Sequence, residues 1–408
     1  MTNEVTQKTT SNEQNVSSSN GLEPLLRFCE FKGNLPQVKL SELFHKCTQK
    51  NRNGAINNVI CNSAKNGLIP QRDFFDKDIA NSENTTGYYI IKNNDFVYNP
   101  RKSNEAPYGP VSIYKDAEDG IVSPLYLCFR ATAPLCAEYF KMYFKSPAWH
   151  RYVYLMGDSG ARHDRVSIKD EVFFDMPVRT PSLSEQQKIA DFLSLVDARI
   201  EKQRLLVESL KKYKRGYFQR IISAFNTHEY MVSDIVEEYN KKTKIQHEYP
   251  ILSSTMSGIK LQNDYFNKQA ASEDTVGYKI VPSGYFTYRS MSDTGEFHFN
   301  LQDVIENGIV SPAYPVFKVI GNNSEFVEYI LNETDEIKSQ LLIKKEGGTR
   351  YALSFSKFKS LKICLPTLEV QDKFVTQLNM IDNLLYIEAK TYDNLQRMKK
   401  GFLQQMFI

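Results

Sequence analysis

Gly120-Ile121-Val122-Ser123-Pro124 recurs letter for letter as Gly308-Ile309-Val310-Ser311-Pro312 in the second half of the chain. Further matches occur in the same order around it: Gly87-Tyr88 with Gly277-Tyr278, Phe96 and Tyr98 with Phe286 and Tyr288, Ser159-Gly160-Ala161-Arg162 with Gly347-Gly348-Thr349-Arg350, and Pro181-Ser182-Leu183 with Pro366-Thr367-Leu368. Solenoid proteins repeat roughly every 20 to 50 residues. That period is much shorter than the separation between the two copies in this chain. The chain is therefore a duplicated module, and such a protein typically binds its target at two places.

The composition is that of an ordinary globular protein. Hydrophobic residues make up 41% and charged residues 24% of 408 residues, a length that favours about two or three domains. Residues 1–21 are almost devoid of apolar side chains, which predicts a disordered polar tail rather than a signal peptide. The apolar runs are too short to span a membrane. We therefore expect a cytoplasmic protein without membrane association. The net charge of +3 leaves nucleic-acid binding open but requires any basic surface to be local.

The motifs of common catalytic sites are absent from the sequence. It contains neither Gly-x-Gly-x-x-Gly nor Gly-x-x-x-x-Gly-Lys, so no nucleotide-binding site is indicated. None of the six cysteines forms a Cys-x-x-Cys pair and no His-x-x-x-His pair occurs, which argues against a zinc site or a disulfide framework. We therefore expect a chain that is not an enzyme and holds neither a cofactor nor a metal.

Each half combines a mixed segment, over residues 22–181 and 225–366, with a helical one. Aromatic and β-branched runs around turn signals predict strand, turn, strand at 88–98 and 278–288. Helical patches are expected at 137–144 and 324–331. The sequence thus predicts the α+β class, with two globular domains.

Two long helices are predicted over residues 182–224 and 367–408. Ser182 and Glu185 have the spacing of a capping box at the start of the first helix. Apolar side chains then recur every seven residues, which is typical of a coiled-coil seam. The residues expected in helix–helix contact and in partner docking are Ile189, Leu193, Val196, Ile200, Val207, Leu210, Phe374, Leu378, Ile381, Leu385, Leu395 and Phe402. Each helix would be roughly 60 Å long.

The two helices most simply pack against each other as an antiparallel coiled coil, with one globular domain at each end. The alternative is that each helix folds back on its own domain. Gln203, Lys214, Glu388 and Lys399 interrupt the apolar rows. They could fix the register of the coiled coil or contact another protein.

Basic side chains occur at corresponding turns of both halves. Arginine suits guanine edges and phosphates, and glycine allows a backbone to approach a ligand closely. The candidate DNA-binding residues are Arg101, Lys102, Arg162 and Arg165 in the first half and Arg289, Lys344, Lys345 and Arg350 in the second. Solvent-exposed loop charge is the simpler explanation for any one of them, but the recurrence in both halves favours DNA contact for the set.

These features together resemble the specificity subunit of type I restriction–modification systems. The specific motifs are Pro-Ser-Leu-Ser-Glu-Gln-Gln-Lys-Ile-Ala over 181–190, Lys-Arg-Gly-Tyr-Phe-Gln-Arg over 214–220 and the ending from Lys400 to Met406. The resemblance covers residues 22–408. The second copy departs from it, because Val370 stands where the capping-box glutamate would be, so we expect a weaker helix cap there.

The resemblance implies an internal pseudo-two-fold repeat of two target-recognition domains, which read an asymmetric bipartite site in double-stranded DNA. The paired helices set the gap between the half-sites and dock two adenine methyltransferase (modification) subunits. Restriction/translocase subunits join this complex. Cofactors would then lie in the partner subunits, which hold S-adenosylmethionine, ATP and Mg.

Two other functions stay open on the sequence alone. The chain could be a coiled-coil scaffold whose globular ends bind proteins rather than DNA. It could also be a stand-alone nuclease-methylase, although the missing cofactor motifs argue against this.

Overall fold

The computed structural model describes residues 23–73, 85–157, 164–224, 227–262, 274–347 and 350–408. The polar tail predicted over 1–21 lies outside these residues. The chain forms two compact units. Unit 1 comprises Met1–Leu205 with Lys390–Ile408, and unit 2 comprises Leu206–Ala389. Each long helix therefore contributes one part to each unit.

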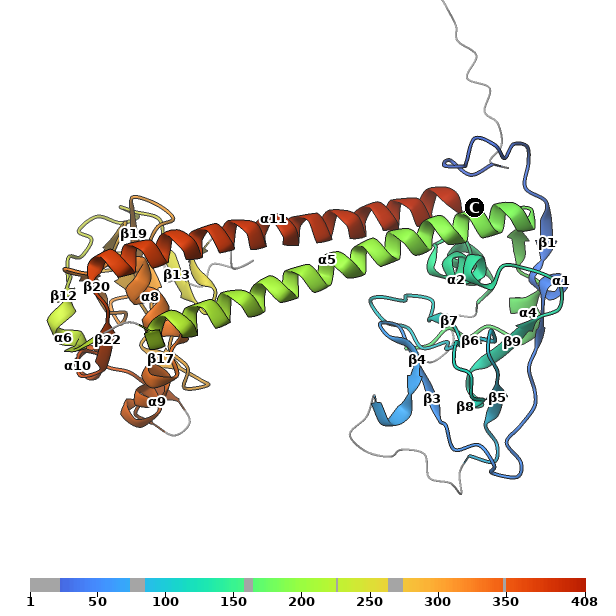
Figure 1. Cartoon of the computed structure of the whole chain (residues 1–408), viewed down its shortest axis with the longest axis horizontal. Helices are drawn as coiled ribbons and strands as arrows, with labels where there is room; N and C mark the ends of the chain where they lie inside the picture. The colour runs from blue at the N-terminus through green and yellow to red at the C-terminus, as the bar shows by residue number, and fades with distance from the viewer. Residues whose placement is uncertain (1–22, 74–84, 158–163, 225–226, 263–273, 348–349) are drawn as a thin grey trace, which may run out of the picture. The chain divides into compact units, whose positions relative to one another are not determined.

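Unit 1 is built from short antiparallel strands covered by helices (Figure 1). Its elements are β1 (Gln37–Lys39), α1 (Leu40–Leu43), β2 (Phe44–Lys46), β3 (Ile60–Ser63), β4 (Gly67–Pro70), η1 (Gln71–Asp73), β5 (Tyr89–Ile91), β6 (Phe96–Tyr98), β7 (Val111–Ile113), β8 (Gly120–Val122), β9 (Leu127–Ala131), α2 (Ala137–Lys145), α3 (His150–Met156), α4 (Asp170–Phe174), β10 (Pro177–Arg179) and the first part of α5 (Leu183–Ala224). The strands pair as β2-β9-β6-β7, β3-β4, β5-β8 and β1-β10.

Side chains alternate between two cores across the central sheet of unit 1. Phe96 and Phe129, which are paired in register, join the core that includes α2 and the helix ends. Their neighbours Val97 and Cys128 point to the opposite face and pack with Ile91 and others in a smaller cluster. This two-residue period is what a sheet buried on both faces requires.

Unit 2 repeats this arrangement strand by strand. Its elements are the last part of α5, β11 (His228–Met231), α6 (Val232–Ile235), β12 (Val236–Glu238), β13 (Leu252–Thr255), β14 (Gly258–Leu261), β15 (Lys279–Pro282), β16 (Phe286–Thr287), β17 (Met291–Ser292), β18 (Asn300–Leu301), β19 (Asn307–Val310), β20 (Val316–Val319), α8 (Ser324–Glu333), α9 (Asp335–Lys344), β21 (Tyr351–Ala352), α10 (Phe355–Lys359), β22 (Lys362–Leu365) and the first part of α11 (Leu368–Met406). The pairings β12-β20-β16-β18, β13-β14, β15-β19 and β11-β22 match those of unit 1, with β17-β21 in addition. The predicted duplication and α+β class are confirmed.

The repeated pentapeptide owes its glycine to close packing. Its first residues form β8 and the end of β19, which pair with β5 and β15. A Cβ added to Gly120 would lie 2.8 Å from Cγ1 of Ile60, and one added to Gly308 would lie 2.4 Å from Cδ1 of Leu252. Since real Cβ contacts are longer, any larger residue at these positions would force the side chains of Ile60 and Leu252 to move.

The long helices α5 (green in Figure 1) and α11 (red) pack antiparallel within each unit. In unit 1 the rings of Phe192 and Phe402 have centroids 5.1 Å apart. In unit 2 the rings of Tyr217 and Phe374 stack at 5.8 Å. The helix ends also join the globular cores of both units, so the two packing modes considered from the sequence occur together.

The predicted seam residues all lie on the inward side of their helices. Four are fully buried: Ile189, Leu193, Phe374 and Leu378. The others are half-buried: Val196, Ile200, Val207, Leu210, Ile381, Leu385, Leu395 and Phe402. Their burial follows the predicted heptad rows, and their part in partner docking stays a prediction.

One buried glutamine at the start of each long helix joins that helix to its globular domain. Gln186 accepts a hydrogen bond from the Cys136 backbone N–H at 3.0 Å and donates to the Pro181 carbonyl at 3.0 Å. Gln371 repeats both contacts in unit 2, with the Asn323 N–H at 2.9 Å and the Pro366 carbonyl at 2.8 Å. This double role explains why Gln371 persists where the rest of the motif has changed.

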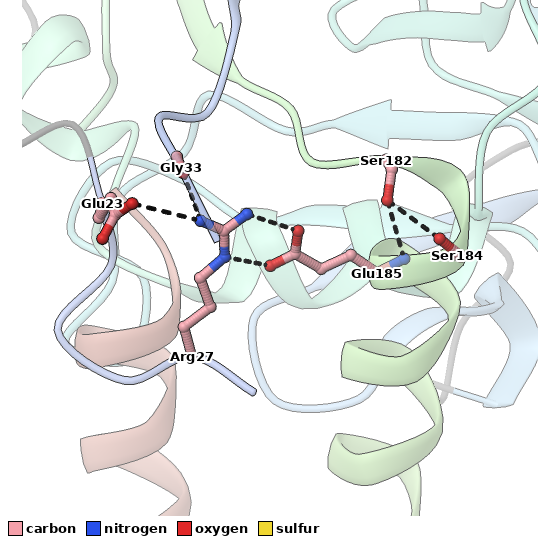
Figure 2. A network of polar contacts seen from close by, with 6 residues as sticks. All are labelled: Glu23, Arg27, Gly33, Ser182, Ser184 and Glu185. Carbon is pink, nitrogen blue, oxygen red and sulfur yellow. Dashed lines mark hydrogen bonds and ion pairs between the residues drawn. The ribbon is translucent and has the colours of Figure 1, made fainter. Parts of the chain in front are cut away.

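The capping box predicted at the start of α5 is only half formed. The Ser182 hydroxyl accepts from the Glu185 N–H at 3.3 Å, as expected. The Glu185 carboxylate, however, binds the Arg27 guanidinium through two hydrogen bonds of 2.7 and 2.8 Å (Figure 2). A bidentate arginine is a stronger partner for a carboxylate than one backbone N–H, so Glu185 is drawn away from the cap.

Candidate nucleic-acid interface

Unit 1 has a surface hollow of about 660 Å³ beside the repeated pentapeptide. Its wall includes β3, the loop after β6 and the turn after β8. The lining comprises Cys61, Asn62, Ser63, Ala64, Lys65, Asn99, Pro100, Arg101, Lys102, Ser103, Asn104, Glu105, Pro110, Ser123, Leu125, Tyr126 and Arg165. Four of these side chains are cationic and one is anionic, so the hollow is locally basic in a chain of nearly balanced charge.

Unit 2 has a hollow of about 780 Å³ at the corresponding place. It is lined by Ile251, Leu252, Ser253, Ser254, Thr255, Met256, Ser257, Gln262, Tyr278, Arg289, Met291, Ser292, Asp293, Thr294, Glu296, Phe297, His298, Ser311 and Tyr314. Ser123 and Tyr126 in the first hollow correspond to Ser311 and Tyr314 in the second. The repeated turn therefore frames both hollows, while most of the polar lining differs.

Three of the four candidates in the first half come together at the first hollow. Arg101 and Arg165 lie opposite each other in an antiparallel bridge. The Lys102 N–H donates to the Asp164 carbonyl at 2.8 Å, which holds the two loops together. Arg165 is 3.9 Å from the carboxylate of its neighbour Asp164. The fourth candidate, Arg162, lies outside the described residues.

The candidates of the second half are dispersed. Only Arg289 lines the second hollow. Arg350 forms an exposed ion pair with Asp293, which does line it, at 2.7 Å. The Lys345 ammonium lies 4.0 Å from the centre of the Tyr351 ring.

Lys344 is engaged within the protein. Its ammonium donates to the carbonyl and the hydroxyl of Ser360, at 2.9 and 2.6 Å. Because Ser360 ends the short helix α10, Lys344 stabilises that helix end. This contact satisfies two of its three donors.

The glycine of the second candidate loop has a structural cause. Gly347 has φ +106°, and a Cβ there would lie 2.0 Å from the Arg350 carbonyl oxygen. The loop therefore folds onto itself at Gly347. The glycine is required by the chain's own backbone, whether or not a ligand approaches it.

Several lining residues were not among the sequence candidates. Lys65 lies beyond β3, and Glu296 and His298 lie on the loop before β18. Burial lowers the pKa of His298, and its Nδ1 lies 2.7 Å from the Asn300 amide oxygen. Because the Asn300 oxygen accepts, Nδ1 carries the proton of the neutral ring, and Nε2 is left as an acceptor. The sequence held no signal for these residues, because the fold, and no spacing rule, brings their segments beside the repeated turns.

Exposed apolar side chains occur at corresponding positions on the outer faces of the long helices. Leu195 is 71% and Met380 65% exposed, while Tyr213 is 59% and Met398 54% exposed. Unit 1 contains Leu195 and Met398, and unit 2 contains Met380 and Tyr213. We call each such pair an outer apolar patch.

Within the part of the chain that the structure describes, no group of three or more His, Cys, Asp or Glu side chains is arranged to hold a metal ion. No helix there has both the length and the apolar content needed to cross a membrane.

Solved structures of restriction–modification subunits share this fold across nearly the whole chain. The HsdS subunit from Thermoanaerobacter tengcongensis is 14% identical with a TM-score of 0.52, over 92% of this chain and 98% of that one. The type I restriction–modification S subunit from M. genitalium is 15% identical with a TM-score of 0.50, over 95% and 99%. A third chain, from a study of complex assembly and conformational transition in the type I R-M system, is 13% identical with a TM-score of 0.56, over 91% and 98%.

The family model described as "Type I restriction modification DNA specificity domain" matches twice, over residues 37–208 and 225–397. These two matches cover most of the chain and coincide with its two structural copies. The chain therefore belongs to the family of type I restriction–modification DNA specificity proteins, as its sequence motifs indicated.

Proposed function

We propose that this chain reads an asymmetric bipartite site in double-stranded DNA, with one half-site bound at each hollow. The observation that carries the proposal is the pair of corresponding hollows with a common frame and different linings. A recognition surface needs a fixed scaffold and a variable set of polar side chains. The chain itself would contribute recognition and no catalysis.

The two linings suit different base edges. Arg101 and Arg165 in the first hollow can donate to N7 and O6 of guanine, and Lys65 and Lys102 can neutralise phosphates. The second hollow offers the acceptors of Glu296 and the neutral ring of His298. Carboxylates accept from the amino group of cytosine. The half-sites should therefore differ in sequence.

The outer apolar patches support docking of two methyltransferase subunits, one at each unit. Each patch combines large exposed apolar side chains from both long helices. Single exposed apolar side chains are common on protein surfaces, but their recurrence at corresponding positions of both copies favours a shared docking role. In this proposal the partner subunits hold S-adenosylmethionine, ATP and Mg, and the restriction/translocase subunits join the same complex. The paired helices would set the gap between the half-sites.

The test is to assemble the chain with its methyltransferase subunits and to map methylated adenines by single-molecule sequencing. Arg101→Ala should relax one half-site only and Arg289→Ala the other only, each by about 1–3 kcal/mol of discrimination. Arg199→Ala, at an exposed site on α5 that lines neither hollow, should change neither half-site.

Two outcomes would count against the proposal. If Arg101→Ala weakened binding to all DNA sequences equally, this arginine would contact phosphate and not bases. If the assembled complex bound no DNA at low salt, the alternative of a scaffold that binds proteins would be favoured.

A further inference from the structure

The same ion pair forms twice between the long helices, once in each unit. In unit 2 the Lys214 ammonium lies 2.6 and 2.8 Å from the two carboxylate oxygens of Asp382. In unit 1 the Lys399 ammonium pairs with Oδ1 of Asp197. Lys214 and Asp197 belong to α5, whereas Asp382 and Lys399 belong to α11. Each pair thus takes its lysine from one copy of the repeat and its aspartate from the other.

Both lysines occupy positions of the apolar seam. Lys214 follows Leu193, Ile200 and Val207 at heptad spacing, and Lys399 occupies the corresponding position in α11. The side chain of Lys214 is 26% exposed and that of Lys399 is 18% exposed. A single polar residue at a core position of a coiled coil commonly specifies its register.

Further contacts hold the pair of unit 2 in place. The Tyr329 hydroxyl donates to Asp382 at 2.7 Å. The Lys214 ammonium also lies 4.9 Å from the centre of the Tyr329 ring. Because Tyr329 belongs to α8, the globular domain contributes to the same ion pair. The pair is therefore built into the fold and is more than a chance contact between two exposed helices.

The two pairs define a single register. Equivalent contacts in one antiparallel register have residue numbers with the same sum, and this sum is 596 for both ion pairs. A slip by one heptad would leave the sevenfold apolar rows in contact. It would place Lys214 opposite Val375 and Asp197 opposite Tyr392, or, in the other direction, Lys214 opposite Ala389 and Asp197 opposite Met406. In neither slipped register does an oppositely charged residue lie directly opposite any of these four side chains.

We infer that the pairs Lys214–Asp382 and Asp197–Lys399 select the register of the two long helices, which the apolar seam alone leaves open to heptad slips. For Lys214 and Lys399, this answers the question that the polar interruptions raised in the sequence, in favour of a register device. If the proposed function holds, the same four residues fix the gap between the DNA half-sites. The register itself does not depend on that function, and it can be measured without DNA.

Disulfide cross-linking of the full chain tests the inference, in a Cys29→Ser background because Cys29 is an exposed free thiol. Phe192→Cys with Phe402→Cys reports the observed register, since these rings touch in the structure. Phe192→Cys with Leu395→Cys reports a slip in one direction, and Tyr217→Cys with Ile381→Cys reports a slip in the other.

The register is then challenged by removing all four charges, with Lys214→Met, Lys399→Met, Asp197→Leu and Asp382→Leu. We expect the yield of slipped cross-links to rise roughly tenfold or more relative to the parent chain, since neither of the two ion pairs is left to oppose a slip. If the charge-free chain formed only the 192–402 cross-link, the apolar seam would be sufficient and the inference would be wrong.

A second pair of variants keeps the test decisive if the charge-free chain does not fold. Asp197→Lys with Lys214→Asp places like charges opposite each other at both ends, and should deplete the 192–402 cross-link. Adding Asp382→Lys and Lys399→Asp restores both pairs in reverse, and should restore this cross-link. Unchanged 192–402 cross-linking in the first of these variants would also overturn the inference.

Discussion

Removing only one partner of the Arg27–Glu185 ion pair should be one of the most destabilising single substitutions in unit 1. The Glu185 side chain is 2% exposed and the Arg27 side chain 12% exposed, so both charges are largely removed from water. Arg27→Met would leave the carboxylate buried and unpaired. Breaking a buried pair in this way costs about 3–5 kcal/mol. Because some water reaches Arg27, we expect the lower end of this range, about 3 kcal/mol.

The loss of stability should be concentrated around the Arg27–Glu185 pair, where the start of α5 meets the end of α11. The Leu26 N–H donates to the Gln405 carbonyl at 3.0 Å, and the ring centroids of Phe28 and Phe192 are 5.8 Å apart. Releasing Arg27 should therefore loosen the last turns of α11 as well as the start of α5. Urea unfolding of the full chain gives the free energy. Hydrogen exchange over residues 398–408 shows whether the effect is local.

Two further variants separate the causes of this loss. Arg27→Met with Glu185→Leu removes both charges, so most of the lost stability should return. Lys39→Met breaks the exposed pair with Asp175 and should cost less than about 0.5 kcal/mol. A loss below about 1 kcal/mol for Arg27→Met would refute the argument from burial, as would a double variant no more stable than Arg27→Met.

Two more predictions concern the cores of the units. Burial raises the pKa of Glu328 to about 7, aided by Asp303 and Glu325 and opposed by the hydrogen bond from the Leu301 N–H. The folded state therefore binds this proton more tightly than the unfolded chain, and the stabilisation present below about pH 4.5 is lost as the pH rises through about 7. Glu328→Gln keeps the hydrogen-bond acceptor, so it should raise the free energy of unfolding by about 1–3 kcal/mol at pH 8 and by far less at pH 5. An equal gain at pH 8 and pH 5 would contradict the raised pKa of Glu328. Gln371→Leu should destabilise unit 2 by about 2–4 kcal/mol in urea unfolding, because it leaves the Asn323 N–H and the Pro366 carbonyl without this partner. Gln186→Leu should have the same effect in unit 1. A cost below about 1 kcal/mol for both variants would show that water replaces the amide.

The features that could be predicted best from the sequence are those that follow from a regular spacing of apolar residues. The heptad rows predicted the contacting stripes of α5 and α11, since a helix presents every seventh residue on one face. The helical patches predicted at 137–144 and 324–331 are α2 and the main part of α8. The repeat also predicted that both halves share one fold.

Contacts between residues distant in the sequence could not be predicted. The Glu185 carboxylate fits a capping box by local spacing, but its stronger partner Arg27 is 158 residues away in the chain. Lys344 reads as a free loop charge, yet it binds the end of a helix. The hollows depend on hairpins packing beside the repeated turns, and no spacing rule connects these segments. The fold shows which basic candidates line a hollow and which make internal contacts, and DNA contact by any of them stays a prediction.

Because each ion pair joins one copy of the repeat to the other, the two copies must evolve together at these four positions. A change at Lys214 cannot be compensated within its own copy, because its partner Asp382 belongs to the other. Among related chains, the residue at position 214 should therefore covary with that at 382, and the residue at 197 with that at 399. The charged positions of either copy can change only in step with the other copy, even while the hollows diverge independently.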